Sequence, residues 1–252
     1  MSYSCLFDLD GTVYRGQSPI EGAVNFINRL KKNDIKYKFI TNRSDRSSEE
    51  VSNHLNTMGI ISTPDSIITS AMGVAGLTKG RRVYVLGSEN LKDCIRGSEA
   101  IITGDQPEDV VIGFDGKINF DDIRDACRKI LSGARFLATN PDVWIQSELG
   151  IVPENGSILA AITSITKIQP IIIGKPNSPM IEIALSDPDI KRDFAVIIGD
   201  NLDTDIAAAN SMGLRSILLL TGVTNSKIAE ASAIKASWIA KDYKALDDII
   251  FS

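Results

Sequence analysis

Short apolar runs alternate with segments of helical periodicity along most of the chain. In the first third, residues 5–7 and 37–40 have the pattern of strands, and residues 22–33 between them place their apolar side chains on one face of a helix. Near the other end, residues 194–198 and 216–220 are continuous apolar runs, which is typical of strands buried on both faces, and a helix is expected between them from Asp205 to Ser211. Strands that alternate with helices in this way predict a mostly parallel sheet.

The middle of the chain, roughly residues 71–169 given the uncertainty of such boundaries, repeats this alternation on its own scale. The apolar runs at 83–86, 110–112 and 135–138 predict strands, and the periodicity at 120–131 predicts a helix. We therefore expect an α/β protein in which the two outer segments form one unit and the middle forms a second.

Composition and charge narrow the class of function. The 252 residues are 43% hydrophobic and 23% charged, which is typical of a globular protein. The net charge is −5, and basic residues are scattered singly or in pairs, which argues against binding to nucleic acid or to a membrane surface. The three cysteines stand far apart and form no zinc-binding pattern. With neither a signal-peptide pattern nor a long apolar stretch, we expect a cytoplasmic protein.

Polar residues follow three of the predicted strands at the point where each strand ends. Asp8 follows the first strand, Thr41 follows the second, and Asp200 comes soon after the strand at 194–198. The carboxyl ends of parallel strands share one edge of a sheet, so we expect these residues to be neighbours. Asp10 stands two residues after Asp8, and in an extended backbone the two carboxylates project to the same side.

The same edge suits a hard metal ion. Asp205 and other carboxylates of residues 200–205 add to those of Asp8 and Asp10. Mg²⁺ prefers a few carboxylate oxygens together with water and phosphate, and without a cation these charges would repel one another. The sequence therefore predicts a Mg²⁺ site at this edge.

These residues also offer what phosphoryl transfer requires. Asp8 can attack phosphorus and become an aspartyl-phosphate, while Asp10 can protonate the leaving oxygen and later take a proton from water. We expect neighbouring carboxylates to crowd Asp10 and to favour its acid form. Thr41 and Asn42 can donate hydrogen bonds to phosphoryl oxygens, and Lys175 can hold phosphate as a point charge. Arg43, next to Asn42, is a further candidate for binding the phosphorylated substrate.

Four short motifs stand in order along the chain: Asp-Leu-Asp-Gly-Thr at 8–12, Thr-Asn at 41–42, Gly-Lys-Pro at 174–176, and the acidic segment at 199–205. Together they resemble the four motifs of the haloacid dehalogenase superfamily. The middle segment resembles the large α/β cap of the NagD-like, p-nitrophenylphosphatase branch, notably at 113–115 and 139–142. This resemblance covers nearly the whole chain.

The resemblance implies a Rossmann-like, doubly wound core formed by residues 1–70 and 170–252, with a smaller α/β cap inserted at 71–169. It implies that Asp8 is the nucleophile, that Asp10 is the acid and base, and that Lys175 anchors the phosphate. The implied Mg²⁺ ligands are Asp8, the carbonyl of Asp10, and Asp200, with Asp205 assisting nearby or through water.

Two departures from the branch leave the substrate open. Arg43 stands where the branch usually has a second Asn, and Pro-Glu-Asn-Gly at 153–156 replaces a glycine-rich loop. Asp142, Trp144 and Glu148 are candidates for substrate selection, although packing within the cap is the more frequent role for an aromatic side chain. His54 lies inside a predicted helix, away from every strand end, and we assign it no role.

A phospho-aspartate signalling or binding module is the alternative from another class, because it also uses an acidic Mg²⁺ pocket. A general acid beside the nucleophile and an inserted lid favour an enzyme that turns over, whereas a dehalogenase gains little from a metal-ready cluster. We predict Mg²⁺-dependent hydrolysis of a small phosphorylated metabolite, such as a sugar phosphate or a nucleoside monophosphate, with no nucleic-acid or membrane partner. A homodimer formed through the cap fits the resemblance.

Overall fold

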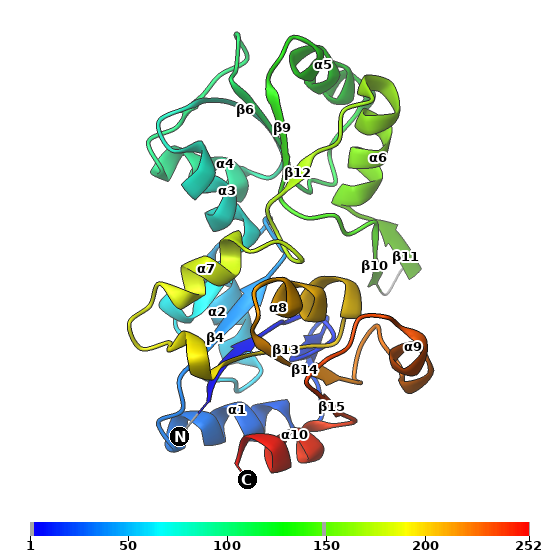
Figure 1. Ribbon diagram of the computed structural model, residues 1–252. Helices are drawn as coiled ribbons and strands as arrows, with labels where there is room; N and C mark the ends of the chain where they lie inside the picture. The colour runs from blue at the N-terminus through cyan, green and yellow to red at the C-terminus, as the bar shows by residue number, and fades with distance from the viewer. Residues whose placement is uncertain (1–2, 148–149, 252) are drawn as a thin grey trace. The chain divides into compact units, whose positions relative to one another are not determined.

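The computed structural model describes residues 3–147 and 150–251 and divides the chain into two compact units. Unit 1 consists of Met1–Thr41, Ser48–Ile68 and Lys175–Ser252, and unit 2 consists of Asn42–Ser47 and Thr69–Gly174. Each unit has its own parallel sheet (Figure 1). No helix within the described ranges is both long and apolar enough to cross a membrane.

Unit 1 is built on a six-stranded sheet with the strand order β15-β14-β13-β1-β4-β5. The strands are β1 (Ser4–Phe7), β4 (Tyr37–Thr41), β5 (Ile67–Thr69), β13 (Ala195–Gly199), β14 (Arg215–Leu219) and β15 (Trp238–Ala240). β1 runs parallel to both of its neighbours, with Phe7 beside Phe39 on one side and Ile198 on the other. The three strands that precede the polar strand-end residues are therefore adjacent, as the sequence predicts.

Helices cover both faces of this sheet (Figure 1). Cys5 and Phe7 pack into one core cluster with side chains of α1, α2 and α10, whereas Leu6 packs on the opposite face with α7 and α8. The unit 1 helices are α1 (Ala23–Lys32), α2 (Ser48–Thr57), α7 (Pro179–Leu185), α8 (Ala207–Ser211), α9 (Ser226–Ala231) and α10 (Tyr243–Ile250). Burial on both faces explains the continuous apolar runs of the strands. The predicted doubly wound, Rossmann-like fold is confirmed.

Two local features of unit 1 differ from the predicted elements. A 3₁₀ turn, Arg192–Phe194, precedes β13, so this strand begins one residue later than expected. The single helix expected from Asp205 to Ser211 is a π-helical turn, Leu202–Ile206, followed by the α-helix α8. Such π turns are frequent at functional sites, and this one carries Asp205.

Unit 2 has a five-stranded parallel sheet with the order β12-β9-β8-β6-β7. Its strands are β6 (Arg82–Leu86), β7 (Ile101–Ile102), β8 (Asp109–Ile112), β9 (Arg135–Ala138) and β12 (Ile171–Ile172), with a separate antiparallel pair, β10 (Trp144–Ser147) and β11 (Gly150–Pro153). One face of the larger sheet packs on α3 (Ser70–Thr78) and α4 (Glu89–Gly97), and the other packs on α5 (Phe120–Leu131) and α6 (Asn155–Thr166). This confirms a second, inserted α/β fold.

The division into units differs from the expected boundaries at three places, each for a structural reason. Ser70 begins α3, and β12 pairs with β9, so the second unit runs from 69 to 174. The segment Asn42–Ser47 also belongs to unit 2, because the Asn42 amide donates to Asp142 (3.2 Å) and the Ser88 hydroxyl donates to the Ser44 carbonyl (3.2 Å). The roles of catalytic core and cap remain predictions.

Candidate active site

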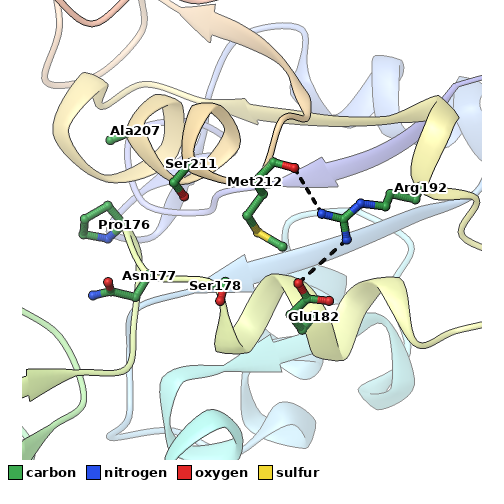
Figure 2. A pocket seen from close by; sticks show the side chains of 8 residues that line it. All are labelled: Pro176, Asn177, Ser178, Glu182, Arg192, Ala207, Ser211 and Met212. Carbon is green, nitrogen blue, oxygen red and sulfur yellow. Dashed lines mark hydrogen bonds and ion pairs between the residues drawn. The ribbon is translucent and has the colours of Figure 1, made fainter.

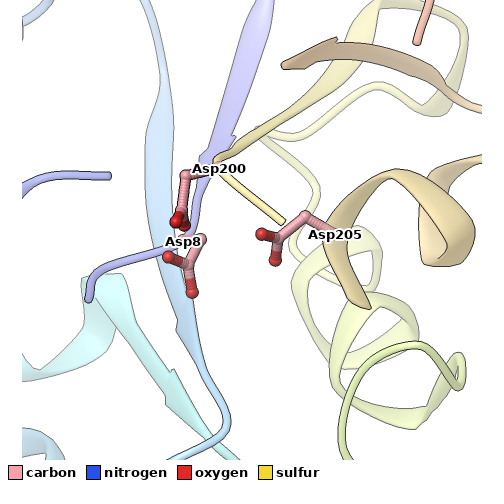
Figure 3. Close-up of side chains that lie close together, drawn as sticks. All are labelled: Asp8, Asp200 and Asp205. Carbon is pink, nitrogen blue, oxygen red and sulfur yellow. The ribbon is translucent and has the colours of Figure 1, made fainter. Parts of the chain in front are cut away.

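Three carboxylates converge at the carboxyl edge of the unit 1 sheet (Figure 3). Asp8 follows β1, Asp200 follows β13, and Asp205 lies in the π-helical turn. Each offers an oxygen, and these oxygens all lie within 4.8 Å of one another. Asp200 and Asp205 are only 2% and 1% exposed, so water screens their charges poorly.

Lys175 contributes a positive charge to the cluster. Its Nζ lies 2.6 Å from Asp8 Oδ1 and 2.6 Å from Asp205 Oδ1, and the residue is 2% exposed. Burial alone would lower the pKa of Lys175, but the two carboxylates raise it above its usual value, so the amine stays protonated. One buried cation thus faces two buried carboxylates and one that is partly buried.

Burial, together with the imbalance of charge, raises the pKa values of two of these acids. Burial raises the pKa of Asp8 well above its usual range; Lys175 lowers it in part, and Asp205 and Asp200 raise it further. Burial and the charge of Asp205 also raise the pKa of Asp200 to about 6. A divalent cation would offset these charges, and its preferred ligands are the hard carboxylate oxygens present here. The residues of the cluster therefore fit a metal ion.

The loop after β14 holds Asp200 in place. The backbone N–H of Val223 donates to Asp200 Oδ2 (2.6 Å), and the Thr12 hydroxyl donates to Oδ1 (3.1 Å). A Cβ at Gly222 would lie 1.8 Å from Asp200 Oδ2, so the close approach of this loop requires glycine. Sequence analysis did not identify Gly222 or Val223, although they follow a strand end as the other site residues do.

Asp205 is engaged on both of its oxygens. Oδ1 accepts from Lys175, and Oδ2 accepts from the backbone N–H of Asn201 (3.2 Å). A Cβ at Gly199 would lie 2.3 Å from the Asp205 carboxyl carbon, so the π-helical turn packs directly against the end of β13. These contacts suit Asp205 to holding the ammonium group of Lys175 in position.

Asp10 lies outside the acidic cluster that the described residues form. Its side chain is exposed, and Oδ2 accepts a hydrogen bond from the Tyr14 hydroxyl (3.3 Å). The crowding by carboxylates that we expected at Asp10 falls on Asp8 instead, because Asp8 points into the buried cluster. Thr41 is buried at the carboxyl end of β4, the strand next to β1.

The other two predicted phosphate contacts belong to unit 2. The Asn42 amide donates to Asp142 Oδ2, which also accepts from the Asn140 amide (2.8 Å). Arg43 Nη1 lies 3.4 Å from Asp45 Oδ2. The structure therefore groups these residues with the polar side chains of unit 2, where Asp142 also lies.

The segment 153–156, one of the two departures from the NagD-like pattern, is closely packed in unit 2. Glu154 caps helix α6, and burial raises its pKa to about 7, with Asp142 adding to the effect. A Cβ at Gly156 would lie 2.3 Å from the Pro141 carbonyl oxygen.

Trp144 is 52% exposed, which contradicts packing in the core of this unit. Glu148 lies outside the described residues.

A separate pocket of about 640 Å³ opens beside helix α7 (Figure 2). At one end, Arg192 donates to the Met212 carbonyl (3.0 Å) and lies 3.7 Å from a Glu182 carboxylate oxygen. The pocket is lined by Pro176 and Ala207 but not by the acidic cluster. Because the acidic residues lie elsewhere, we do not assign the reaction to this pocket, despite its volume.

Comparison with known proteins decides the family. A family model described as haloacid dehalogenase-like hydrolase matches residues 5–100, and a HAD hydrolase-like model matches residues 172–246. An acid sugar phosphatase of Staphylococcus saprophyticus is 35% identical over 242 residues, which are 94% of this chain and 93% of that protein. The chain belongs to the haloacid dehalogenase-like hydrolases.

Solved structures of this family share the fold. Glycerol phosphate phosphatase from Mycobacterium tuberculosis, solved in complex with magnesium, superposes with a TM-score of 0.91 at 33% identity, over 97% of this chain and 76% of that chain. NagD from Escherichia coli superposes with a TM-score of 0.89 at 29% identity, over 96% and 98%. This chain is thus a NagD-like phosphatase.

Proposed function

We propose that the chain hydrolyses small phosphomonoesters in a Mg²⁺-dependent reaction that passes through an aspartyl-phosphate on Asp8. The position of Asp8 is the main support. Its carboxylate stands at the end of the central strand β1, beside two further carboxylates and 2.6 Å from a buried lysine. A carboxylate held in this way can act as a nucleophile toward a phosphoryl group that the lysine helps to bind.

Asp8, Asp200 and the backbone carbonyl of Asp10 would hold the metal ion, with Asp205 nearby. When bound, Mg²⁺ supplies positive charge that offsets the carboxylates and the phosphoryl oxygens. Lys175 contributes its own charge to the phosphoryl group, and Thr41 contributes a hydroxyl from the neighbouring strand end.

The chain's own side chains account for each bond and each proton. An oxygen of Asp8 forms a bond to phosphorus while the ester P–O bond breaks, and Asp10 gives its proton to the leaving oxygen. Water then attacks the phosphorus of the aspartyl-phosphate while Asp10 takes back a proton. The bond between Asp8 and phosphorus breaks, which releases inorganic phosphate and restores both carboxyl groups.

We further propose that unit 2 is the cap that selects the substrate, with Asn42 and Arg43 as phosphate contacts. The relatives named acid sugar phosphatase and glycerol phosphate phosphatase favour a small, hydroxyl-rich phosphomonoester. The segment Pro-Glu-Asn-Gly at 153–156 stands where the resemblance implies a glycine-rich loop, so the substrate preference of this chain need not match that of either relative.

Phosphate release tests the proposal. The assay compares p-nitrophenyl phosphate, sugar phosphates, glycerol phosphates and nucleoside monophosphates, in Mg²⁺ or in EDTA. We expect turnover in Mg²⁺, none in EDTA, and none for Asp8→Asn, while Asp203→Asn, which removes an exposed carboxylate of the same loop as Asp200, retains activity. Turnover by folded Asp8→Asn would overturn the role of Asp8, and turnover in EDTA would overturn the role of the metal.

A further inference from the structure

The proposed acid and base, Asp10, is an exposed side chain on a tight loop. Gly11 has a φ of +86°, and its N–H donates to the Tyr14 carbonyl (2.8 Å), so the loop folds back on itself. An exposed carboxylate can rotate, whereas proton transfer requires a fixed distance and direction to the leaving oxygen. Proton transfer by this side chain therefore requires a neighbouring group that orients it.

Tyr14 makes the contact that can do so. Its hydroxyl donates to Asp10 Oδ2 (3.3 Å), and the residue is only 3% exposed, so its ring is held by surrounding side chains. The distance is long for an O–H···O bond, and catalytic hydrogen bonds of this kind commonly shorten when substrate binds. Tyr14 thus anchors the carboxylate from the buried side of the loop.

His54 holds Tyr14 from another part of the chain. Its ring lies edge to face with the Tyr14 ring, at 5.2 Å between centroids and an angle of 83°. Its Nε2 lies 3.0 Å from the Gly16 carbonyl oxygen, an acceptor, so this nitrogen carries a proton and donates. Through these two contacts, helix α2 supports the hairpin of β2 (Tyr14–Arg15) and β3 (Ser18–Pro19).

We propose that Tyr14 is a positioning residue for Asp10, and that His54 positions Tyr14. This inference rests on the proposed acid and base role of Asp10. The hydrogen bond from Tyr14 restricts rotation of the carboxylate, so that Asp10 presents its proton to the leaving oxygen in the same orientation at each turnover. Tyr14 keeps its own proton throughout.

The test uses two substrates of similar shape that differ in their need for a proton. Phenyl phosphate has a poor leaving group that benefits from protonation, whereas p-nitrophenyl phosphate has a good one. For Tyr14→Phe we expect kcat/KM to fall about tenfold on phenyl phosphate, the loss of one hydrogen bond, and less than about twofold on p-nitrophenyl phosphate. Tyr37→Phe, which removes a hydroxyl that donates to the Ile61 carbonyl (2.8 Å) in the same unit, should change neither.

A double-mutant cycle tests the second contact. His54→Ala should lower kcat/KM on phenyl phosphate about threefold in the natural protein and have no effect in the Tyr14→Phe background. His54→Phe keeps an aromatic edge against Tyr14 and should restore most of the loss. Additive losses in the double variant would overturn the role of His54.

Equal losses on the two substrates, or no loss on either, would overturn the role of Tyr14. Failure of the proposed function has a different signature. If Asp10→Asn lowers kcat/KM, which reports the phosphorylation step alone, equally on both substrates, Asp10 is not the general acid. If Asp8→Asn still turns over, the nucleophile is wrong. Circular dichroism and thermal midpoints of each variant show whether a loss reflects unfolding.

Discussion

Removing one charge from the acidic cluster should stabilise the metal-free protein. In the absence of a cation, ionised Asp200 is buried beside Asp8 and Asp205 with a single lysine as partner. Asp200→Asn keeps the shape of the side chain. Its amide oxygen can still accept from the Val223 N–H, and its amide nitrogen can donate to the Thr12 hydroxyl oxygen. The substitution therefore removes charge and leaves the hydrogen bonds possible.

The expected magnitude follows from the titration of Asp200. Its pKa rises from 3.8 to about 6 on folding, which corresponds to about 3 kcal/mol of lost stability at neutral pH when no cation is bound. For a chain of this length, that difference corresponds to roughly 6–12 °C in the thermal midpoint. We expect Asp200→Asn to approach this gain in EDTA.

The pH dependence has a definite sign. The folded state holds the proton of Asp200 more tightly than the unfolded state does, so the contribution of this group is fully favourable below about pH 4. It is lost as the pH rises from about 4 through about 6. In EDTA, the natural protein should therefore lose stability across this window relative to Asp200→Asn.

Thermal unfolding followed by circular dichroism between pH 4 and pH 8 measures both effects, in EDTA and in Mg²⁺. Adding Mg²⁺ should raise the midpoint of the natural protein and should have little effect on Asp200→Asn. Asp203→Asn is the matched control, because that carboxylate is exposed, and it should behave as the natural protein does. Equal midpoints for Asp200→Asn and the natural protein in EDTA at pH 7 would refute the inference that burying a charged Asp200 beside Asp205 costs stability.

Two further substitutions probe the same site. Lys175→Met leaves the carboxylates without their buried cation. In urea, the free energy of unfolding of the metal-free protein should fall by about 3–5 kcal/mol, and phosphate release should stop. An unchanged urea midpoint would contradict this. Gly222→Ala places a methyl group where Asp200 Oδ2 lies, so it should lower kcat/KM at least tenfold and remove the rise of the thermal midpoint in Mg²⁺. Gly104→Ala, where no atom lies within 4 Å of the added carbon, is the control, and equal effects of the two glycine variants would contradict the steric explanation.

The arrangement of the main site could be predicted from sequence because it follows from one rule about parallel sheets. Apolar runs marked β1, β4 and β13, and a polar residue stood at or after the end of each. If these strands are neighbours in a parallel sheet, Asp8 and Asp200 lie side by side at its carboxyl edge. The register of the sheet in unit 1 bears this out.

The supporting residues could not be predicted in the same way. Val223 donates a hydrogen bond through its backbone N–H, so the identity of its side chain does not predict that contact. Tyr14 and His54 meet only because helix α2 packs beside the first hairpin, a tertiary contact that no local pattern encodes. Likewise, Asp8 and not Asp10 lies beside the other carboxylates, because the two side chains point in different directions. The spacing of two residues in the sequence does not determine those directions.

The central claim is that Asp8 carries the phosphoryl group during turnover. The most direct measurement is rapid acid quench of the natural protein mixed with p-nitrophenyl phosphate and Mg²⁺, followed by digestion and mass spectrometry of the peptide that contains Asp8. We expect one phosphoryl group on Asp8, formed within a single turnover and absent in Asp8→Asn. Release of phosphate with no phosphorylated Asp8 at any quench time, or a phosphoryl group on another residue, would contradict it.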